Sequence, residues 1–129
     1  MSRPMPRPVL DASAVLALLQ EEPGADEVEE MLDGALMSCV NLSEVLQKAA
    51  QHGADIEGLE YDLEALGVEF RPFDVTAATG TAALWSAGSG LSLGDRACLA
   101  LAQAEGAVAT TTERRWLNAD HPVPVRLLR

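Results

Sequence analysis

Short apolar runs alternate with longer amphipathic segments along most of this chain. The apolar runs predict five β-strands, at 8–10, 36–40, 68–73, 107–110 and 123–127. The segments with a helical pattern predict α-helices at 13–20, 25–32, 42–51, 56–66, 75–87 and 95–105, followed by a helical turn at 113–118. Strands separated by helices favour parallel β-α-β units with right-handed crossovers. The pattern therefore predicts an α/β fold, a three-layer α/β/α domain around a central, mostly parallel sheet.

Length and composition indicate one globular domain. The chain has 129 residues, of which 48% are apolar and 22% charged, an ordinary balance for a protein with a packed core. We expect a single domain over 1–129 with a loose tail at 1–6. No apolar run is long enough to span a membrane, and the N-terminus lacks the apolar stretch of a signal peptide, so we expect a cytoplasmic location. Cys39 and Cys98 lie in apolar segments and are expected to be buried thiols.

The formal net charge of −11 narrows the range of partners. Nonspecific nucleic-acid binding draws most of its affinity from Lys and Arg on phosphates, and this chain has few of them. A protein this acidic can still act on nucleic acid if a bound metal and a few local arginines supply the attraction. The charge also favours a basic protein partner, because opposite net charges speed encounter.

Four acidic residues lie where a predicted strand ends or a predicted helix begins: Asp11, Glu44, Asp95 and Glu113. The carboxyl ends of parallel strands meet at one edge of the sheet, so these side chains are expected to converge. Carboxylates crowded together repel one another unless a cation neutralises them. Oxygen ligands without His or Cys favour Mg²⁺ or Mn²⁺. The sequence therefore predicts a metal-dependent hydrolase.

Each acid taken singly also has a structural explanation. Asp11 can cap the helix that follows it. The segment from Asn41 to Glu44 resembles a capping box. Asp95 stands at the head of a helix, where the helix dipole favours negative charge, and Glu113 can cap its own short turn. The common position of all four favours a shared function for the set.

Other site chemistries fit the sequence less well. No glycine-rich phosphate loop follows the first strand, where DASAV stands, and there is no GxSxG elbow. Ser13 and Thr111 are better assigned as polar groups that hold carboxylates in place, although capping and turn formation explain them equally well. A phosphatase-like or receiver-like site around Asp11 would need a nearby lysine, and Lys48 is the only one in the chain.

Four motifs, in this order, resemble those of the PIN domain family, and more narrowly those of VapC-type toxins of VapBC toxin–antitoxin pairs. They are VLDASAVLALL, NLSEVLQKA, LSLGDRACLALA and TTERRW. The resemblance covers almost the whole chain, and the ordered set is more specific than any one motif. It implies a PIN-like fold and Mg²⁺- or Mn²⁺-dependent endoribonuclease activity.

The resemblance also assigns roles to residues. It implies metal ligands and polar neighbours for them: Asp11, Glu44 and Asp95 as ligands, Ser13 and Thr111 as neighbours. The last family motif usually reads T-x-D, whereas this chain has Glu113, which reaches one methylene further. This difference bears on a second metal position more than on the first, because Mg²⁺ tolerates little geometric slack.

Partners follow from the same resemblance. It implies a homodimer and a cognate antitoxin, basic and VapB-like, bound near helices 13–20 and 25–32. Five apolar side chains of these helices are candidates for a groove that takes a partner helix, although most are expected in the core: Leu16, Leu19, Val28, Met31 and Leu32.

Three arginines next to the acids are candidate RNA-phosphate contacts: Arg96, Arg114 and Arg115. For Arg115 an ion pair with a nearby acid is an equal alternative. Trp85 and Trp116 could stack on bases but are expected to be packing residues. The alternative function is a degenerate, non-catalytic PIN-like domain that binds protein or RNA, and Glu113 is the sequence feature that favours it.

Overall fold

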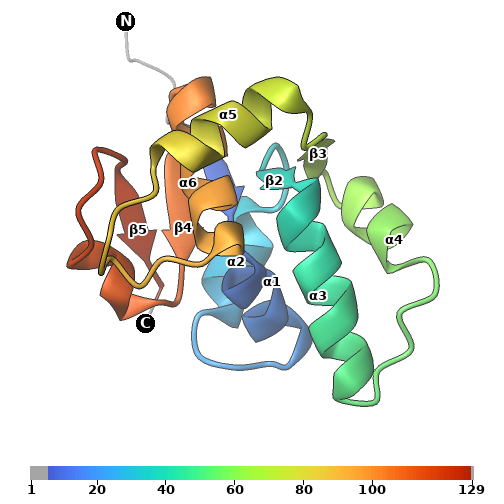
Figure 1. The fold of residues 1–129 in the computed structure, drawn as a ribbon. Coiled ribbons are helices and arrows are strands. Elements are labelled where there is room, and N and C mark those ends of the chain that lie inside the picture. The colour runs from blue at the N-terminus through green and yellow to red at the C-terminus, as the bar shows by residue number, and fades with distance from the viewer. Residues whose placement is uncertain (1–5, 129) are drawn as a thin grey trace, which may run out of the picture.

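A computed structural model describes residues 6–128 of the chain, and five parallel strands form its sheet (Figure 1). The strands are β1 Pro8–Leu10, β2 Leu36–Ser38, β3 Glu69–Arg71, β4 Val108–Thr111 and β5 Val125–Leu127. Their order in the sheet is β3-β2-β1-β4-β5, with every pair parallel. The predicted α/β fold with a parallel sheet is confirmed. Most of the tail expected at 1–6 lies outside the described residues.

Two apolar cores, one on each face, hold the sheet between helices. The side chains of the central strand β1 alternate, so Val9 belongs to one core and Leu10 to the other, and both are fully buried. Val9 pairs in register with Leu36 on β2 and Ala109 on β4, which share its core. A strand buried on both faces has to be apolar throughout, as PVL is.

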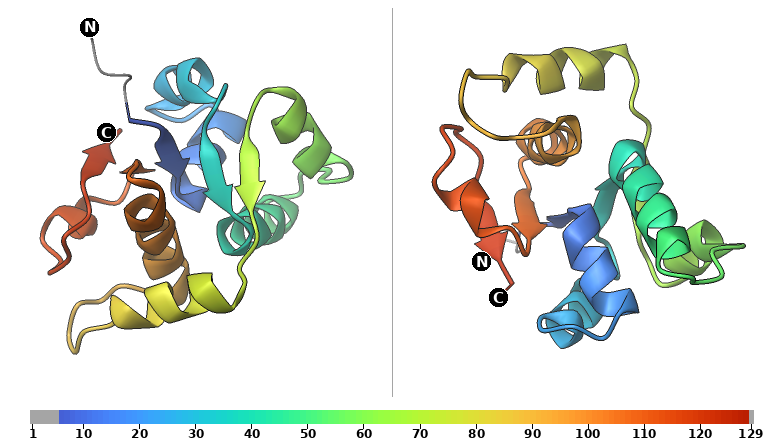
Figure 2. Two further views of the ribbon diagram at one scale, coloured as in Figure 1. Left: turned by 90° about the horizontal axis from the view of Figure 1, so that it is seen from above. Right: turned by 60° about the horizontal axis from the view of Figure 1, so that its bottom comes forward.

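Six helices and one 3₁₀ turn surround the sheet: α1 Ala12–Leu19, α2 Ala25–Met31, α3 Cys39–Gln51, α4 Leu59–Ala65, α5 Val75–Ala83, α6 Leu93–Glu105 and η1 Arg114–Leu117. In Figure 2, α5 and α6 lie on one side of the sheet, and α1 and α2 on the other. Within residues 6–128, no helix combines the length and the apolar character needed to cross a bilayer.

Most predicted elements are present, with shifted ends. The second strand was predicted to reach residue 40 but ends at Ser38, whose Oγ accepts from Val40 N at 3.2 Å and caps α3. Asn41 therefore lies inside the first turn of α3, and the predicted capping box from Asn41 to Glu44 is wrong. Helix α6 begins earlier than expected, because Ser92 caps it in a capping box with Asp95.

Burial corrects one further expectation and agrees with another. Cys39 is exposed rather than buried, while Cys98 is buried as expected, and both thiols are free. Val28 and Leu32 are core residues, as was expected of most of the five groove candidates, and only Leu19 among the five is exposed. The helices 13–20 and 25–32 thus present few apolar side chains to a partner.

The position of α6 over the sheet predicts that replacing two of its leucines by alanine will lower the free energy of unfolding by very different amounts. Leu99 is fully buried in the core that includes Val9, whereas Leu93 at the start of the same helix is exposed. We expect Leu99→Ala to lower the free energy of unfolding by about 2–5 kcal/mol, through lost burial and the cavity left behind. Leu93→Ala is the matched control and should cost less than about 0.5 kcal/mol. Urea denaturation measures both, and equal costs would contradict this placement of α6.

Candidate functional site

The junction of β1 and α1 places a carboxylate at the carboxyl edge of the sheet. Asp11 follows β1 directly, donates its backbone N–H to Thr110 O at 2.9 Å, and is only 4% exposed. Its side chain makes no cap bond to α1. Instead its Oδ2 accepts from Ser13 Oγ at 2.7 Å and from Thr111 Oγ1 at 2.9 Å. Helix capping therefore does not explain this carboxylate.

The two hydroxyls that hold Asp11 also join α1 to the end of β4. Ser13 Oγ and Thr111 Oγ1 lie 3.2 Å apart. Ser13 Oγ accepts from Thr112 N at 3.1 Å, and Thr111 Oγ1 accepts from Glu113 N at 3.0 Å. These bonds fix one oxygen of Asp11, and no described residue donates a hydrogen bond to its Oδ1.

A second carboxylate is held by contacts between α3 and α6. Glu44 Oε1 accepts from Asn41 Nδ2 at 2.9 Å, and the same amide nitrogen donates to Gly94 O at 3.0 Å. A side chain at Gly94 would overlap the Glu44 carboxylate. Asn41 is fully buried, and its Oδ1 has no hydrogen-bond partner among the described residues. A buried amide oxygen without a partner suits a ligand or a water at this place.

The third carboxylate sits in the first turn of α6 and carries an arginine. Asp95 Oδ2 accepts from Ser92 N at 2.8 Å and from Arg115 Nη1 at 2.7 Å. The bond to Asp95 raises the pKa of the Arg115 guanidinium above its ordinary value. Arg115 Nε also lies 3.7 Å from Glu113 Oε2. Of the two alternatives for Arg115, the structure contains the ion pair.

Burial and neighbouring charge make the protonation of Asp11 unusual. Burial, joined by smaller contributions from the charges of Asp95 and Glu44, raises the pKa of this carboxyl to about 6. The hydrogen bonds from Ser13 and Thr111 act in the opposite direction but are outweighed. An ionised Asp11 is therefore costly in the isolated protein and would be relieved by a nearby cation.

The donor set fits a hard divalent cation, although the side chains are not arranged as a closed metal cage. Among residues 6–128, no group of three or more His, Cys, Asp or Glu side chains has positions that could hold a metal ion as they stand. The available ligand atoms around Asp11, Glu44 and Asp95 are all oxygens, which Mg²⁺ and Mn²⁺ prefer. A metal would require the carboxylates to turn toward it.

The predicted acidic residues lie close together, whereas the predicted phosphate contact Arg96 is bonded elsewhere. Asp11, Glu44 and Asp95 lie close enough that the charges of Glu44 and Asp95 raise the pKa of Asp11, and Arg115 links Glu113 to Asp95. Arg96 Nη1 donates to Thr81 O at 3.1 Å, so that guanidinium is engaged by α5.

The remaining candidates for contact with RNA are one arginine and two tryptophans, and they differ in exposure to solvent. Arg114 is exposed. Trp116 is buried in the core, as expected, but Trp85 is exposed, so its assignment to packing is wrong.

Sequence reasoning missed three residues that shape the site: Asn41, Gly94 and Ser92. Asn41 and Gly94 meet across 53 positions of sequence. The motif NLSE contains the first of them, but only the start of α3 at Cys39 places its side chain beside Glu44. A glycine immediately before Asp95 was the available signal for a close approach.

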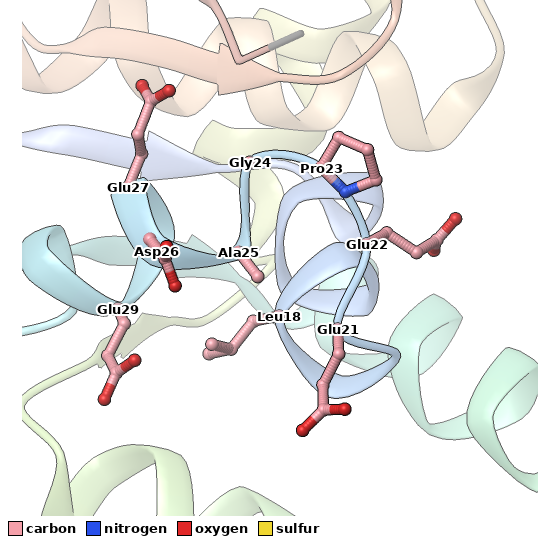
Figure 3. Close-up of a pocket in the computed structure, with 9 residues that line it drawn as sticks. All are labelled: Leu18, Glu21, Glu22, Pro23, Gly24, Ala25, Asp26, Glu27 and Glu29. Atoms are coloured by element: carbon pink, nitrogen blue, oxygen red, sulfur yellow. The ribbon is translucent and has the colours of Figure 1, made fainter.

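An acid-lined pocket of about 650 Å³ lies away from this site, where α1 turns into α2 (Figure 3). Leu18 and Ala25 lie between acidic side chains contributed by α2 and by the connection that precedes it: Glu21, Glu22, Asp26, Glu27 and Glu29. Glu27 forms an ion pair with Arg126 on β5 at 3.1 Å. The pocket combines an apolar side chain with several carboxylates, a surface suited to a basic peptide.

Comparison with known proteins gives a family match and similar folds. The sequence profile of the PIN domain matches residues 9–122. A toxin–antitoxin complex from Klebsiella pneumoniae is similar in structure, with 19% identity, TM-score 0.67, and 81% of this chain and 85% of that chain covered. FitAcB from Neisseria gonorrhoeae is also similar, with 20% identity, TM-score 0.67, and coverages of 92% and 95%.

A third similar structure is VapBC2 from Rickettsia felis bound to a DNA fragment from their promoter. It shares 13% identity at TM-score 0.64, with 95% of this chain and 98% of that chain covered. At these identities the likeness shows a common fold. A search of curated protein sequences finds no match.

The raised pKa of Asp11 predicts a pH-dependent gain in stability when its charge is removed. Because the folded-state pKa lies above the unfolded value of 3.8, the ionised carboxylate destabilises the folded protein above about pH 6, and this effect disappears below the unfolded value. In excess chelator, Asp11→Asn should raise the free energy of unfolding at pH 8 by up to about 3 kcal/mol. Urea denaturation from pH 3.5 to 8 should show the gap closing at the acidic end. A gap that does not change with pH would contradict this account.

Proposed function

The chain belongs to the PIN domain family, and we propose that it is a Mg²⁺- or Mn²⁺-dependent endoribonuclease, the VapC-like toxin of a toxin–antitoxin pair. One observation carries the proposal: Asp11 is buried at the carboxyl edge of the sheet, with the buried Asp95 and the half-buried Glu44 close enough for their charges to raise its pKa. Buried like charges persist where they have a ligand to hold, because they otherwise destabilise the fold.

Three carboxylates are the proposed ligands, and their neighbours set their orientation. Ser13 and Thr111 hold Oδ2 of Asp11, so Oδ1 is the oxygen left available to a metal. Asn41 holds one oxygen of Glu44 in the same way. A bound divalent ion supplies a water of lowered pKa and offsets the negative charge of a phosphodiester.

Glu113 is the fourth proposed acid, and its part differs from that of the others. Its backbone N–H donates to Thr111 Oγ1, which fixes the place of its backbone beside Asp11. Its carboxylate lies toward Arg115. We propose that it lines the side of the site where a second ion or the phosphate would bind.

Positive charge near the carboxylates would attract the RNA backbone. Arg114 is exposed on η1, and Arg115 is partly exposed beside it, so both are proposed phosphate contacts. Arg96 is a weaker candidate, since its guanidinium is bound to the Thr81 carbonyl.

The acid-lined pocket between α1 and α2 is the proposed docking place of a basic antitoxin segment. The similar structures include toxin–antitoxin complexes, which supports such a partner. The pocket is rich in carboxylates and contains few apolar side chains, so attraction between opposite charges should contribute more than apolar burial.

A second copy of the chain is a further proposed partner. Three exposed apolar side chains stand at the start of α5, just past its end and at the start of α6: Val75, Trp85 and Leu93. Their exposure would be relieved in a homodimer that covers this side.

The first test is cleavage of RNA by purified protein free of any antitoxin. We expect cleavage in Mg²⁺ or Mn²⁺ and none in excess chelator. Asp11→Asn and Glu44→Gln should each lower the rate at least about 100-fold, the scale of losing one electrostatic group in an active site. Asp62→Asn, on the exposed surface of α4, is the matched control and should cleave like the natural chain.

Two results would contradict the proposal in different ways. Cleavage that survives chelator or Asp11→Asn would exclude the metal mechanism. Absence of both cleavage and Mn²⁺ binding would favour the alternative, a non-catalytic PIN-like domain that binds protein or RNA.

The partner is tested with the product of any short reading frame that adjoins this gene and encodes a basic protein. Reversing charge at the pocket, with Glu21→Lys and Glu29→Lys together, should weaken binding at least about tenfold and make it less sensitive to salt. The matched control changes the same charge elsewhere, with Glu105→Lys and Asp120→Lys. Equal effects of the two pairs, measured by calorimetry, would exclude the pocket as the docking place.

A further inference from the structure

We propose that Arg115 is an internal counter-cation that takes the place of a second divalent ion, so that the chain binds a single metal ion at Asp11, Glu44 and Asp95. The inference rests on the proposed function and deepens it, because it names the residue that limits the metal count. Arg115 would be a positioning residue for the metal site, acting through the carboxylates that it neutralises.

The guanidinium of Arg115 contacts three residues from different segments: Asp95, Gly90 and Glu113. Nη1 donates to Asp95 Oδ2 at 2.7 Å and to Gly90 O at 3.0 Å. Nε lies 3.7 Å from Glu113 Oε2. One guanidinium therefore joins η1, the first turn of α6 and the connection between α5 and α6.

The ion pair is unequal in burial, which makes it strong on the Asp95 side. The Asp95 side chain is 8% exposed, whereas those of Arg115 and Glu113 are 46% and 43% exposed. A buried carboxylate gains more from a positive partner than an exposed one, because water screens it less. Asp95 is therefore the stronger partner of Arg115, and Glu113 adds a weaker attraction that water screens.

The hydrogen bonds at Asp95 leave little room for a metal on that side. Its Oδ2 already accepts from Ser92 N and from Arg115 Nη1. An ion placed between Asp95 and Glu113 would have to displace the guanidinium or be repelled by it. The hydrogen bonds that Asp95 accepts from described residues go to Oδ2, which leaves Oδ1 as the oxygen available to a metal.

The neighbouring arginine provides a natural contrast. Arg114 stands one position earlier on the same 3₁₀ turn and is exposed, and no ion pair or hydrogen bond of its side chain occurs within residues 6–128. Removing either arginine removes the same charge, but only Arg115 contacts the site. Any difference between the two variants therefore reports on the contact rather than on net charge.

Calorimetric titration with Mn²⁺ at fixed pH tests the inference without relying on activity. We expect the natural chain to bind one Mn²⁺. Arg115→Ala should bind a second Mn²⁺, or bind the first at least about tenfold more tightly, which is the scale of one unit charge close to an ionisable group. Arg115→Gln keeps side-chain N–H donors but loses the charge, and should behave like Arg115→Ala. Arg114→Ala should titrate like the natural chain.

The outcomes separate this inference from the proposed function. If Arg115→Ala and Arg115→Gln both titrate like Arg114→Ala, or if the natural chain already binds two ions, the inference is overturned. The proposed function then stands as long as Asp11→Asn abolishes binding. If neither the natural chain nor the Arg115 variants bind Mn²⁺, the proposed function fails and the inference fails with it. Thermal unfolding of each variant, followed in the same buffer, confirms that the titrated protein is folded.

Discussion

Burial of the Asp11 carboxylate at the end of the central strand is the constraint on which the site depends. A carboxylate that is 4% exposed cannot be stabilised by bulk water, so the protein has to supply its partners. Ser13 and Thr111 supply two hydrogen bonds, which do not offset the loss of hydration and the charges of Asp95 and Glu44. The surrounding structure must hold this unfavourable arrangement in place, and the two packed cores beside β1 do so.

The topology explains why residues distant in sequence surround one carboxylate. Pairing of β1 with β4 brings Thr111 beside Asp11, because both strands are parallel and end at the same edge. Helix α6 contacts the sheet and α3, and places Gly94 against the carboxylate of Glu44. The absence of a side chain at Gly94 permits the approach. A substitution there would disturb the site through sterics rather than through charge.

How far the sequence predicts this structure depends on the range of the contacts involved. The strand and helix types follow from local patterns, and Asp11 is predicted at the carboxyl edge because it directly follows an apolar strand. The ion pair between Asp95 and Arg115 was one of two alternatives, because nothing local decides between a phosphate and a carboxylate partner. Asn41 was assigned to a cap because the helix was predicted to start at residue 42. Ser38 caps α3 instead, so the helix starts at Cys39 and the Asn41 side chain reaches Glu44 from inside the first turn.

Glu113 and Arg115 are best understood together rather than as separate departures from a family pattern. An aspartate at 113 would hold its carboxylate one methylene closer to the backbone, which is itself fixed by the Thr111 hydroxyl. The glutamate extends far enough for its carboxylate to lie 3.7 Å from the Arg115 guanidinium, which also binds Asp95. A longer acid and a basic residue two positions later can thus replace a short acid and an ion. On this view Glu113 does not indicate a degenerate site, because its carboxylate pairs with Arg115, a cation that the chain itself provides.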